Sequence, residues 1–341
     1  MDKCLFISKS ALLENIRYYS QKTCKDIIAV IKNNAYGHGV KEIVSILEVS
    51  NIKMYAVSNI DEAIDVRKYT NKDILIMDKI EDIDKIDENM IITVISKKHL
   101  LELIKLDKEI RVHLKINVAM KRKGIDTWQI KECLDIIGKS KLILDGVYTH
   151  YSTHKLKKVK KQFCCFKKSL EELKNKQIII HASSSISSLV LNENITNAIR
   201  VGVGMYGLKK LVKEMDPLKI TTELKGEIKN SYKIKRLDKF SYDNTYFGKK
   251  GYIVMMNIGY GDGLFYKKRI KGYVDGEYIK EIGVRNMDNM YFYSPNYIIE
   301  NSIVEIYGKH IKLDKIAKTN KIAVCRLLAL LNTNIKKQII S

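Results

Sequence analysis

The residue of this chain whose surroundings point most directly to chemistry is a lysine that follows a short apolar segment. Residues 27–31 are all apolar, Lys32 comes next, and a Tyr-Gly-His-Gly loop starts at Tyr36. Burial against an apolar wall disfavours the ammonium form of a lysine, so its pKa falls and the nucleophilic amine becomes available. The pattern therefore indicates a lysine that forms a Schiff base with a carbonyl cofactor. A lysine that simply extends from a strand end into solvent fits the same spacing.

Four further polar clusters follow apolar segments in the same way. They are HLKINVAMKRKG (113–124), GVYTHYSTH (146–154), IIHASSS (179–185) and IRVGVGMYGL (199–208). Each lies at the predicted carboxyl end of a strand, and in a parallel barrel these ends meet at one rim. The clusters therefore predict a single active site. Taken one at a time, His113, His150 and His181 also fit histidines that are hydrogen-bonded within a core.

The segments that must position these clusters alternate between apolar runs and amphipathic stretches. Strands are predicted at 27–31, 54–57, 73–77, 91–95, 111–116, 142–147, 177–181 and 198–201. Helices are predicted at 39–49, 60–69, 97–106, 126–137, 157–174 and 184–191. Eight strands that alternate with helices indicate parallel βα units and the number that closes a barrel, although a doubly wound open sheet also has this alternation.

The pattern changes after Pro217, where strand-like runs follow one another without helices between them. These runs are 220–229, 252–258, 273–275, 278–282 and 303–306. Such a series is typical of an antiparallel β domain. A last helix is predicted near 313–331. The fold class expected from the whole pattern is an α/β N-terminal domain followed by a mostly β domain.

Three segments of the chain resemble motifs of the alanine racemase family. AVIKNNAYGHG (29–39) is similar to the family's A-V-x-K-A-x-A-Y-G-H-G around the pyridoxal-phosphate lysine, with Asn33 in place of an alanine. IGYGDG (258–263) is similar to I-G-Y-[AG]-D-G, and IGVRNMDNM (282–290) contains a match to G-R-x-x-M-D. The resemblance covers nearly the whole chain.

The resemblance also implies the domains. It implies a (β/α)8 TIM-type barrel over residues 8–215 and a mostly β domain over residues 216–341, with residues 1–7 pairing into the second domain.

The cofactor implied by the resemblance is pyridoxal 5'-phosphate. Lys32 would bind it covalently, and Tyr36 would donate a hydrogen bond to its phosphate. Positions that hold the same phosphate, largely through backbone N–H groups, are matched by Ser185, Gly202 and Val203. A helix that starts after residues 183–185 would suit this anion, because its free N–H groups and its dipole point outward.

Arg200 matches the arginine that faces the pyridine nitrogen of the cofactor, and His181 matches the residue that supports it. Because an arginine does not give up its proton, the ring nitrogen would stay unprotonated and the cofactor would be a weaker electron sink. Racemisation needs a base on each face of the substrate, and the resemblance assigns Lys32 to one face and the partner subunit's Tyr260 to the other. His150 and Arg200 would supply the positive charge that brings the pKa of this tyrosine toward neutrality.

The substrate side of the site is implied by Arg122, Met287 and Asp288. Arg122 matches the arginine that holds the substrate carboxylate, and the other two match a segment that lines the neighbouring subunit's site. Lys115 matches a lysine often found carbamylated, whose negative charge would orient Arg122. Because each site takes residues from two chains, the resemblance implies an obligate homodimer with shared active sites.

The chain departs from the family's pattern around the substrate. Residues 117–119 (NVA) replace the common D-T-G, so an acid is missing and carbamylation of Lys115 is in question. Residues 330–339 lack the usual R-x-P-R and a tyrosine, which leaves Thr333 or a neighbouring asparagine near the substrate pocket. A polar group there leaves room for a hydroxyl, whose recognition discriminates strongly only where the pocket's own polar group would otherwise be unpaired.

Composition narrows the classes of partner. The formal charge of +22 raises nucleic acid and anionic membranes as candidates. However, most lysines are interleaved with acidic residues, and neither zinc-finger spacing nor an aromatic RNA-binding signature accompanies them. We therefore expect no nucleic-acid partner and no metal.

The cellular compartment is predicted from cysteines and apolar runs. The six cysteines lack CxxC spacing, which indicates reduced, mostly buried thiols. The chain opens without a signal-peptide pattern and has no apolar run of the roughly 20 residues that a membrane span needs. We expect a cytoplasmic protein with no membrane partner.

The sequence thus predicts an isomerase that interconverts L- and D-alanine and supplies D-alanine for peptidoglycan. One alternative is a serine or broad-specificity amino-acid racemase on the same scaffold. Another is a non-catalytic pyridoxal-phosphate-binding paralogue, which the presence of Tyr260 and Asp288 disfavours. Decarboxylases with this barrel place a cysteine, not this tyrosine, opposite the lysine.

Overall fold

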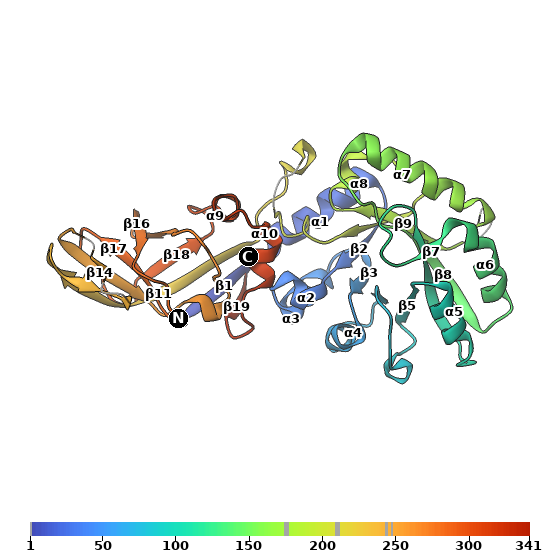
Figure 1. Cartoon of the computed structure of the whole chain (residues 1–341), viewed down its shortest axis with the longest axis horizontal. Helices are drawn as coiled ribbons and strands as arrows, with labels where there is room; N and C mark the ends of the chain where they lie inside the picture. The colour runs from blue at the N-terminus through green and yellow to red at the C-terminus, as the bar shows by residue number, and fades with distance from the viewer. Residues whose placement is uncertain (1, 174–176, 209–211, 243–244, 247) are drawn as a thin grey trace. The chain divides into compact units, whose positions relative to one another are not determined.

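The computed structural model describes residues 2–173, 177–208, 212–242, 245–246 and 248–341. The chain divides into two compact units. One comprises Leu12–Ala35 and Ile43–Lys219, and the other Met1–Ala11, Tyr36–Glu42 and Ile220–Ser341. We describe each unit by itself (Figure 1). The domain ranges 8–215 and 216–341 stay a prediction.

The first unit contains a closed barrel of eight parallel strands in the order β5-β4-β3-β2-β10-β9-β8-β6, with β6 pairing back to β5. The strands are β2 (Asp26–Val30), β3 (Ile52–Val57), β4 (Ile74–Ile76), β5 (Met90–Val94), β6 (Ile110–Asn117), β8 (Leu142–Tyr148), β9 (Ile179–Ser184) and β10 (Ala198–Val201). All eight overlap the predicted strands, so the barrel is confirmed. A two-residue strand, β7 (Ile125–Asp126), extends the sheet beside β6.

One helix precedes the first barrel strand, and further helices follow most of the barrel strands in the sequence. They are α1 (Lys9–Thr23), α3 (Val40–Leu47), α4 (Ile60–Arg67), α5 (Lys97–Ile104), α6 (Ile130–Gly138), α7 (Leu156–Ser169) and α8 (Ser187–Val190). The side chains of Asn59 and Ser96 accept backbone N–H groups at the starts of α4 and α5.

The predicted helix over 184–191 is too long, because β9 continues to Ser184 and α8 is a single turn. The Ser187 hydroxyl accepts the N–H of Ser184 (2.8 Å), and such local side-chain bonds compete with a helix.

The second unit is built on an eight-stranded sheet in the order β14-β17-β16-β15-β18-β11-β1-β19, in which β14 also pairs with β11. Its strands are β1 (Lys3–Ser8), β11 (Thr222–Ile234), β14 (Gly251–Met256), β15 (Lys271–Val274), β16 (Glu277–Ile282), β17 (Met290–Ser294), β18 (Ile303–Tyr307) and β19 (Lys336–Ile340). A separate hairpin joins β12 (Lys239–Phe240) to β13 (Thr245–Tyr246). The mostly β fold is confirmed.

The first strand of the chain belongs to this second unit. β1 pairs antiparallel with β11 and parallel with β19. This confirms the prediction that the first residues join the second sheet. β17 and β19 are strands that we did not predict.

Two further predictions are wrong. The helix expected over 313–331 is two helices, α9 (Leu313–Asn320) and α10 (Val324–Ala329), separated by Lys321 in the left-handed conformation (φ +54°). The Asn320 side chain ends α9, since it accepts the N–H of Lys268 (2.7 Å) and donates to Ile316 O (2.9 Å). The thiols are not mostly buried, because Cys24, Cys164 and Cys165 are exposed.

Within the residues that the structure describes, no helix has both the length and the apolar character to cross a bilayer.

Candidate functional site

A left-handed turn fixes the backbone directly after Lys32. The φ angles of residues 33–36 are +54°, +49°, +53° and +55°. An L-residue in this conformation costs about 1–2 kcal/mol, and asparagine tolerates it better than most. Asn33 and Asn34 occupy the first two of these positions, so the asparagine at 33 suits the geometry better than the alanine it replaces.

Barrel contacts hold this turn in place. The carboxylate of Glu62, in the first turn of α4, accepts the N–H of Asn33 and the N–H of Ser58, both at 2.7 Å. The N–H of Ile31 donates to Ala56 O on the neighbouring strand β3 (3.0 Å). Lys32 therefore leaves the end of β2 from a backbone with little freedom.

A buried arginine lies at the same end of the barrel. Arg200, on β10, has 4% of its surface exposed and donates hydrogen bonds to four acceptors. Its Nη1 lies 2.6 Å from His181 Nδ1, and its Nη2 lies 3.2 Å from His150 Nδ1. Nη2 also donates to Thr149 O (2.7 Å) and Ala182 O (2.8 Å). The structure thus brings three of the predicted site residues together.

Tyr148 supports this group, and the sequence analysis missed it. Its fully buried ring stacks on His181, with centroids 4.7 Å apart and 12° between the planes. The Arg200 guanidinium carbon lies 5.0 Å from the ring centroid and Lys115 Nζ lies 5.7 Å from it. Its place directly before Thr149 and His150 at the end of β8 is the sequence signal that could have identified it.

Positive charge is concentrated around His150. Burial first, and then the charges of Arg200, Lys115, Arg122 and Lys32, lower the pKa of His150 to about 3. This imidazole is therefore neutral at pH 7, so our prediction that His150 supplies positive charge is wrong. The positive charge comes from its cationic neighbours. Because its Nδ1 faces an arginine that can only donate, its proton is on Nε2.

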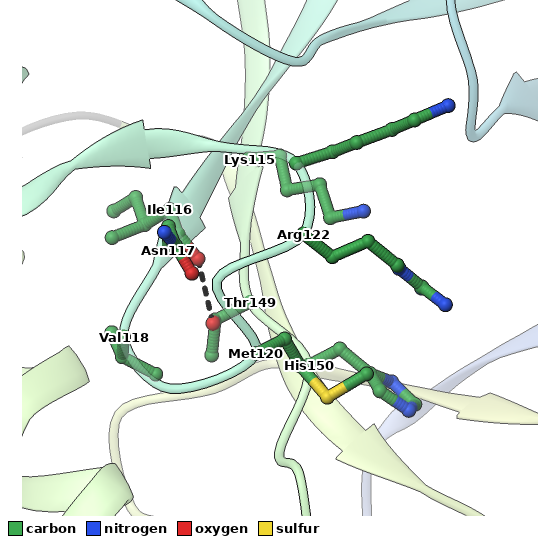
Figure 2. Close-up of a pocket in the computed structure, with 9 residues that line it drawn as sticks. Lys115, Ile116, Asn117, Val118, Met120, Arg122, Thr149 and His150 are labelled. Atoms are coloured by element: carbon green, nitrogen blue, oxygen red, sulfur yellow. Dashed lines mark hydrogen bonds between the residues drawn. The ribbon is translucent and has the colours of Figure 1, made fainter.

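The loop after β6 and the end of β8 line a small pocket. Figure 2 shows the side chains of Lys115, Arg122 and His150 extending to the same side of this loop. Asn117 folds the loop by accepting the N–H of Lys121 (2.9 Å), so it replaces the family's acid without adding charge. The residues lining this pocket include no carboxylate.

An anion cradle lies between β9 and the loop after β10. The N–H groups of Gly202 and Gly204 converge on the Ser185 hydroxyl at 3.0 and 3.2 Å. Gly204 has no room for a side chain, because a Cβ there would lie 2.1 Å from the Tyr19 hydroxyl oxygen. The buried Ser183 hydroxyl has no hydrogen-bonding partner among the described residues. Converging N–H and O–H donors in this region fit a phosphate.

This cradle replaces the helix start that we expected to bind the phosphate. The single turn of α8 offers no extended helix dipole. The loop of residues 202–204 therefore provides the converging donors. Together with the cations around His150, these donors suit an anionic ligand.

The remaining predicted site residues belong to the other unit. Tyr260 begins a short turn whose backbone is fixed by two hydrogen bonds, Tyr260 N–H to Asn286 O and Gly261 N–H to Met287 O, both 2.9 Å. A Cβ at Gly259 would lie 2.3 Å from the Met287 oxygen, so only glycine fits there. Tyr260 is 40% exposed and Met287 is 56% exposed, and Asp288 is also exposed.

The C-terminal tail supports this turn. Asn332 donates from Nδ2 to Gly261 O (3.0 Å) and from its backbone N–H to Asp262 O (3.1 Å). Asp262 is buried, accepts the N–H of Gly259 (3.0 Å) and pairs with Lys3 (2.8 Å). Tyr36 lies in the same unit, next to Gly37, where a Cβ would lie 1.9 Å from Leu328 O. Tyr260 therefore projects from a rigid support.

Known proteins and family models match this chain along most of its length. The family model "Alanine racemase, N-terminal domain" matches residues 7–210, and "Alanine racemase, C-terminal domain" matches residues 221–339. The alanine racemase of Listeria monocytogenes serotype 4b (strain F2365) is 30% identical over 321 residues, which cover 89% of this chain and 87% of the relative.

Solved structures show the same fold. The alanine racemase from E. faecalis has a TM-score of 0.92 and 24% identity, covering 99% of this chain and 98% of that one. The histidine racemase from Leuconostoc mesenteroides subsp. sake has a TM-score of 0.89 and 20% identity, covering 100% of this chain and 98% of that one. Proteins named for two different substrates thus share the fold.

Proposed function

Because this chain belongs to the alanine racemase family of pyridoxal-phosphate-dependent isomerases, we propose that it interconverts L- and D-alanine by a two-base mechanism. The observation that carries the proposal is the cationic group around His150, formed by Lys32, Lys115, Arg122 and Arg200. This group suits an anionic cofactor and a substrate carboxylate bound side by side.

The residues present fit pyridoxal phosphate. Lys32 would hold its aldehyde carbon, and Tyr36, Ser185, Gly202 and Val203 would hold its phosphate. When bound to an amino acid, this cofactor withdraws electrons from the Cα–H bond, so the proton there becomes removable. Arg200 would donate to the ring nitrogen without transferring its proton, which limits electron withdrawal and favours return of the proton to Cα.

Two bases would exchange that proton on opposite faces of Cα. The amine of Lys32 serves one face, and the partner subunit's Tyr260 serves the other. His150 offers its Nε2–H to the phenolate oxygen of that tyrosine, because its Nδ1 is occupied by Arg200. A donated hydrogen bond and nearby positive charge both lower the pKa of a phenol.

The proposal includes a homodimer with shared active sites. Tyr260 and Met287 are both exposed on their own unit, although both are large and apolar in part. Backbone hydrogen bonds join the turn that carries Tyr260 to residues 286–287, so the two side chains are held on one support. An exposed yet rigid tyrosine suits insertion into the site of a second copy of this chain.

The substrate proposed is alanine, with Arg122, Met287 and Asp288 near its carboxylate. The physiological role would be supply of D-alanine for peptidoglycan in the cytoplasm. Serine is the second candidate, because Thr333 or a neighbouring asparagine gives the tail a polar group where the family has a tyrosine. A non-catalytic paralogue is the third, and a protein without turnover would support it.

Chiral chromatography of L-alanine and L-serine, incubated separately with the purified holoenzyme, tests the proposal. We expect D-alanine to form faster than D-serine, and Lys32→Ala to abolish both reactions together with the absorbance of the lysine-bound cofactor. Faster D-serine formation would move the substrate to serine. Full turnover by Lys32→Ala would refute the site.

A further inference from the structure

Three buried side chains, Arg200, His181 and His113, form a hydrogen-bonded series that we call the arginine–histidine series. Arg200 Nη1 lies 2.6 Å from His181 Nδ1, and His181 Nε2 lies 3.0 Å from His113 Nδ1. Both histidines are fully buried. His113 Nε2 has no well-aligned hydrogen-bonding partner among the described residues, and it faces the Asp145 carboxylate at 3.4 Å.

Arg200 determines which nitrogen of each histidine in this series carries the proton. A guanidinium only donates, so His181 Nδ1 must accept and the proton of a neutral His181 is on Nε2. That Nε2–H donates to His113 Nδ1, so the proton of a neutral His113 is on its Nε2 as well. This last nitrogen lies 3.4 Å from Asp145 Oδ2, and a carboxylate only accepts. Arg200 and Asp145 therefore demand the same tautomer of both histidines from opposite ends.

Charge and burial agree with this assignment. Burial lowers the pKa of both His113 and His181, and the nearby charge of Arg200 lowers that of His181 further. Burial raises the pKa of Asp145, but its contacts with His113 and Arg111 outweigh this, and the carboxyl group stays ionised near neutrality. The groups that face His113 are Asp145, Arg111, Asp73 and His181.

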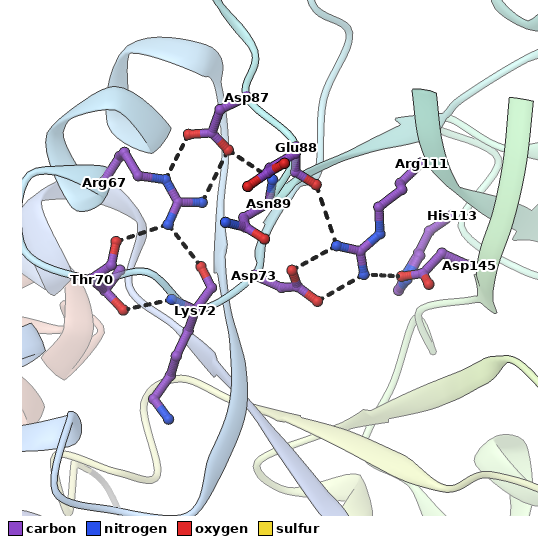
Figure 3. Close-up of polar contacts among 10 residues, drawn as sticks. All are labelled: Arg67, Thr70, Lys72, Asp73, Asp87, Glu88, Asn89, Arg111, His113 and Asp145. Atoms are coloured by element: carbon purple, nitrogen blue, oxygen red, sulfur yellow. Dashed lines mark hydrogen bonds and ion pairs between the residues drawn. The ribbon is translucent and has the colours of Figure 1, made fainter. Parts of the chain in front are cut away.

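An ion-pair cluster holds Asp145 beside His113, at the end of the series remote from Arg200 (Figure 3). Arg111 binds both oxygens of Asp73 (2.7 and 2.8 Å) and Asp145 Oδ2 (3.1 Å). Asp145 and Asp73 are each 23% exposed at the side chain, so this end reaches solvent. Gly146 makes room for the His113 ring, because a Cβ there would lie 2.5 Å from His113 Nε2.

We propose that Asp145 and His113 are positioning residues for racemisation, which fix the tautomer of His181 and thereby orient Arg200 toward the pyridine nitrogen. The inference rests on the proposed role of Arg200 at that nitrogen. If His181 adopted the other tautomer, two N–H groups would face each other and Arg200 would lose its acceptor. The Asp145 carboxylate disfavours that tautomer through His113. A carboxylate that accepts the free N–H of a metal-bound histidine fixes the histidine's tautomer in the same way.

The test is Asp145→Asn in the holoenzyme labelled with 15N at histidine. In the wild type, we expect 15N NMR to show His113 and His181 neutral with the proton on Nε2, unchanged between pH 6 and 9. In Asp145→Asn, we expect His113 to populate the other tautomer and kcat for alanine to fall about tenfold, with KM within about twofold. The variant Asp145→Glu, which keeps a carboxylate at this position, should show the same tautomers as the wild type.

A matched control is the second arginine network in Figure 3. Arg67 pairs with Asp87 (2.7 Å) and donates to Thr70 O (2.8 Å), and Asp87 also accepts the N–H of Asn89 (2.9 Å). Asp87→Asn removes a comparable ion pair and should leave both the tautomers and kcat unchanged.

Two outcomes would overturn the inference. One is unchanged tautomers in Asp145→Asn, and the other is an equal loss of kcat in Asp87→Asn, which would mark a general loss of stability. Should Asp145→Asn fail to fold, the wild-type 15N spectrum decides, because a proton on Nδ1 of either His113 or His181 would overturn the inference. A wild-type protein without racemase activity would instead refute the proposed function, while the tautomers of His113 and His181 would still be measured independently.

Discussion

At the scale of single residues, Lys115 has the most unusual acid–base environment among the amines of the site. Burial, followed by the positive charges of Arg122 and Arg200, lowers its pKa to about 8, although Asp78 acts in the opposite direction. A lysine with this pKa is half neutral at pH 8, and only the neutral amine reacts with carbon dioxide. The added carbamate would place a negative charge among these cations.

We therefore predict that Lys115 is carbamylated in bicarbonate buffer and that the modified fraction rises between pH 7 and pH 9. The sign follows from the lowered pKa, because the neutral fraction of the amine grows as the pH rises through 8. The measurement is 13C NMR with labelled bicarbonate, and Lys115→Arg, which cannot be carbamylated, is the control. No resonance specific to Lys115 at pH 8.5 would refute the prediction.

The sequence indicated some residues of the site and left others out, for a physical reason. Lys32 and Arg200 lie at strand ends within motifs, so their types and spacing point to chemistry. The pairing of His113 with Asp145 depends on β6 and β8 being neighbours in the closed barrel, which no local pattern of the sequence contains. Tyr148 was missed because its role comes from stacking, which leaves no polar signature.

At the scale of elements, the left-handed turn after Lys32 is a strained support with an identifiable weak position. Asn33 is exposed and has φ +54°, so a substitution there changes the backbone cost without disturbing a core. We predict that Asn33→Val destabilises the protein by about 1–2 kcal/mol, because a β-branched residue is poorly tolerated at this φ. Thermal unfolding of the apoprotein measures this.

Two matched variants test the cause of that loss. Asn33→Gly should be at least as stable as the wild type, since glycine has no steric cost at positive φ. Asn33→Ala should fall between valine and glycine. If valine and glycine were equally destabilising, the Asn33 side chain and not its backbone conformation would be the source.

Elements with a clear apolar pattern were predictable from the sequence, and elements without one were not. The barrel strands have nearly continuous buried residues, so their existence follows from composition. β19 has no buried residue and is held to β1 by backbone pairing, so its sequence gives no strand signal. The break between α9 and α10 depends on a hydrogen bond from Lys268, a residue remote in the sequence.

At the scale of the whole molecule, the proposed dimer makes a quantitative prediction. Lys32→Ala and Tyr260→Phe are each expected to be inactive, yet a heterodimer of the two contains one site with both wild-type residues. Random exchange in an equal mixture should restore about a quarter of the wild-type activity. Chiral chromatography before and after mixing under mild dissociating conditions measures this.

The control for subunit exchange is each variant treated alone in the same way. Recovery in either unmixed sample would reveal residual activity instead of complementation. No recovery in the mixture, after mass spectrometry has confirmed that heterodimers formed, would exclude sites shared between subunits.

The pairing of β1 with both β11 and β19 has a consequence for how the protein is made. β1 leaves the ribosome long before its partner β19, which begins only at residue 336. At cellular rates of about 5–20 residues per second, the intervening chain takes on the order of tens of seconds to synthesise. During that time the barrel strands can assemble, while the backbone N–H and C=O groups of β1 that pair with β19 have no partner strand. Chaperone occupancy on stalled nascent chains should therefore persist at β1 until translation has passed the last strand.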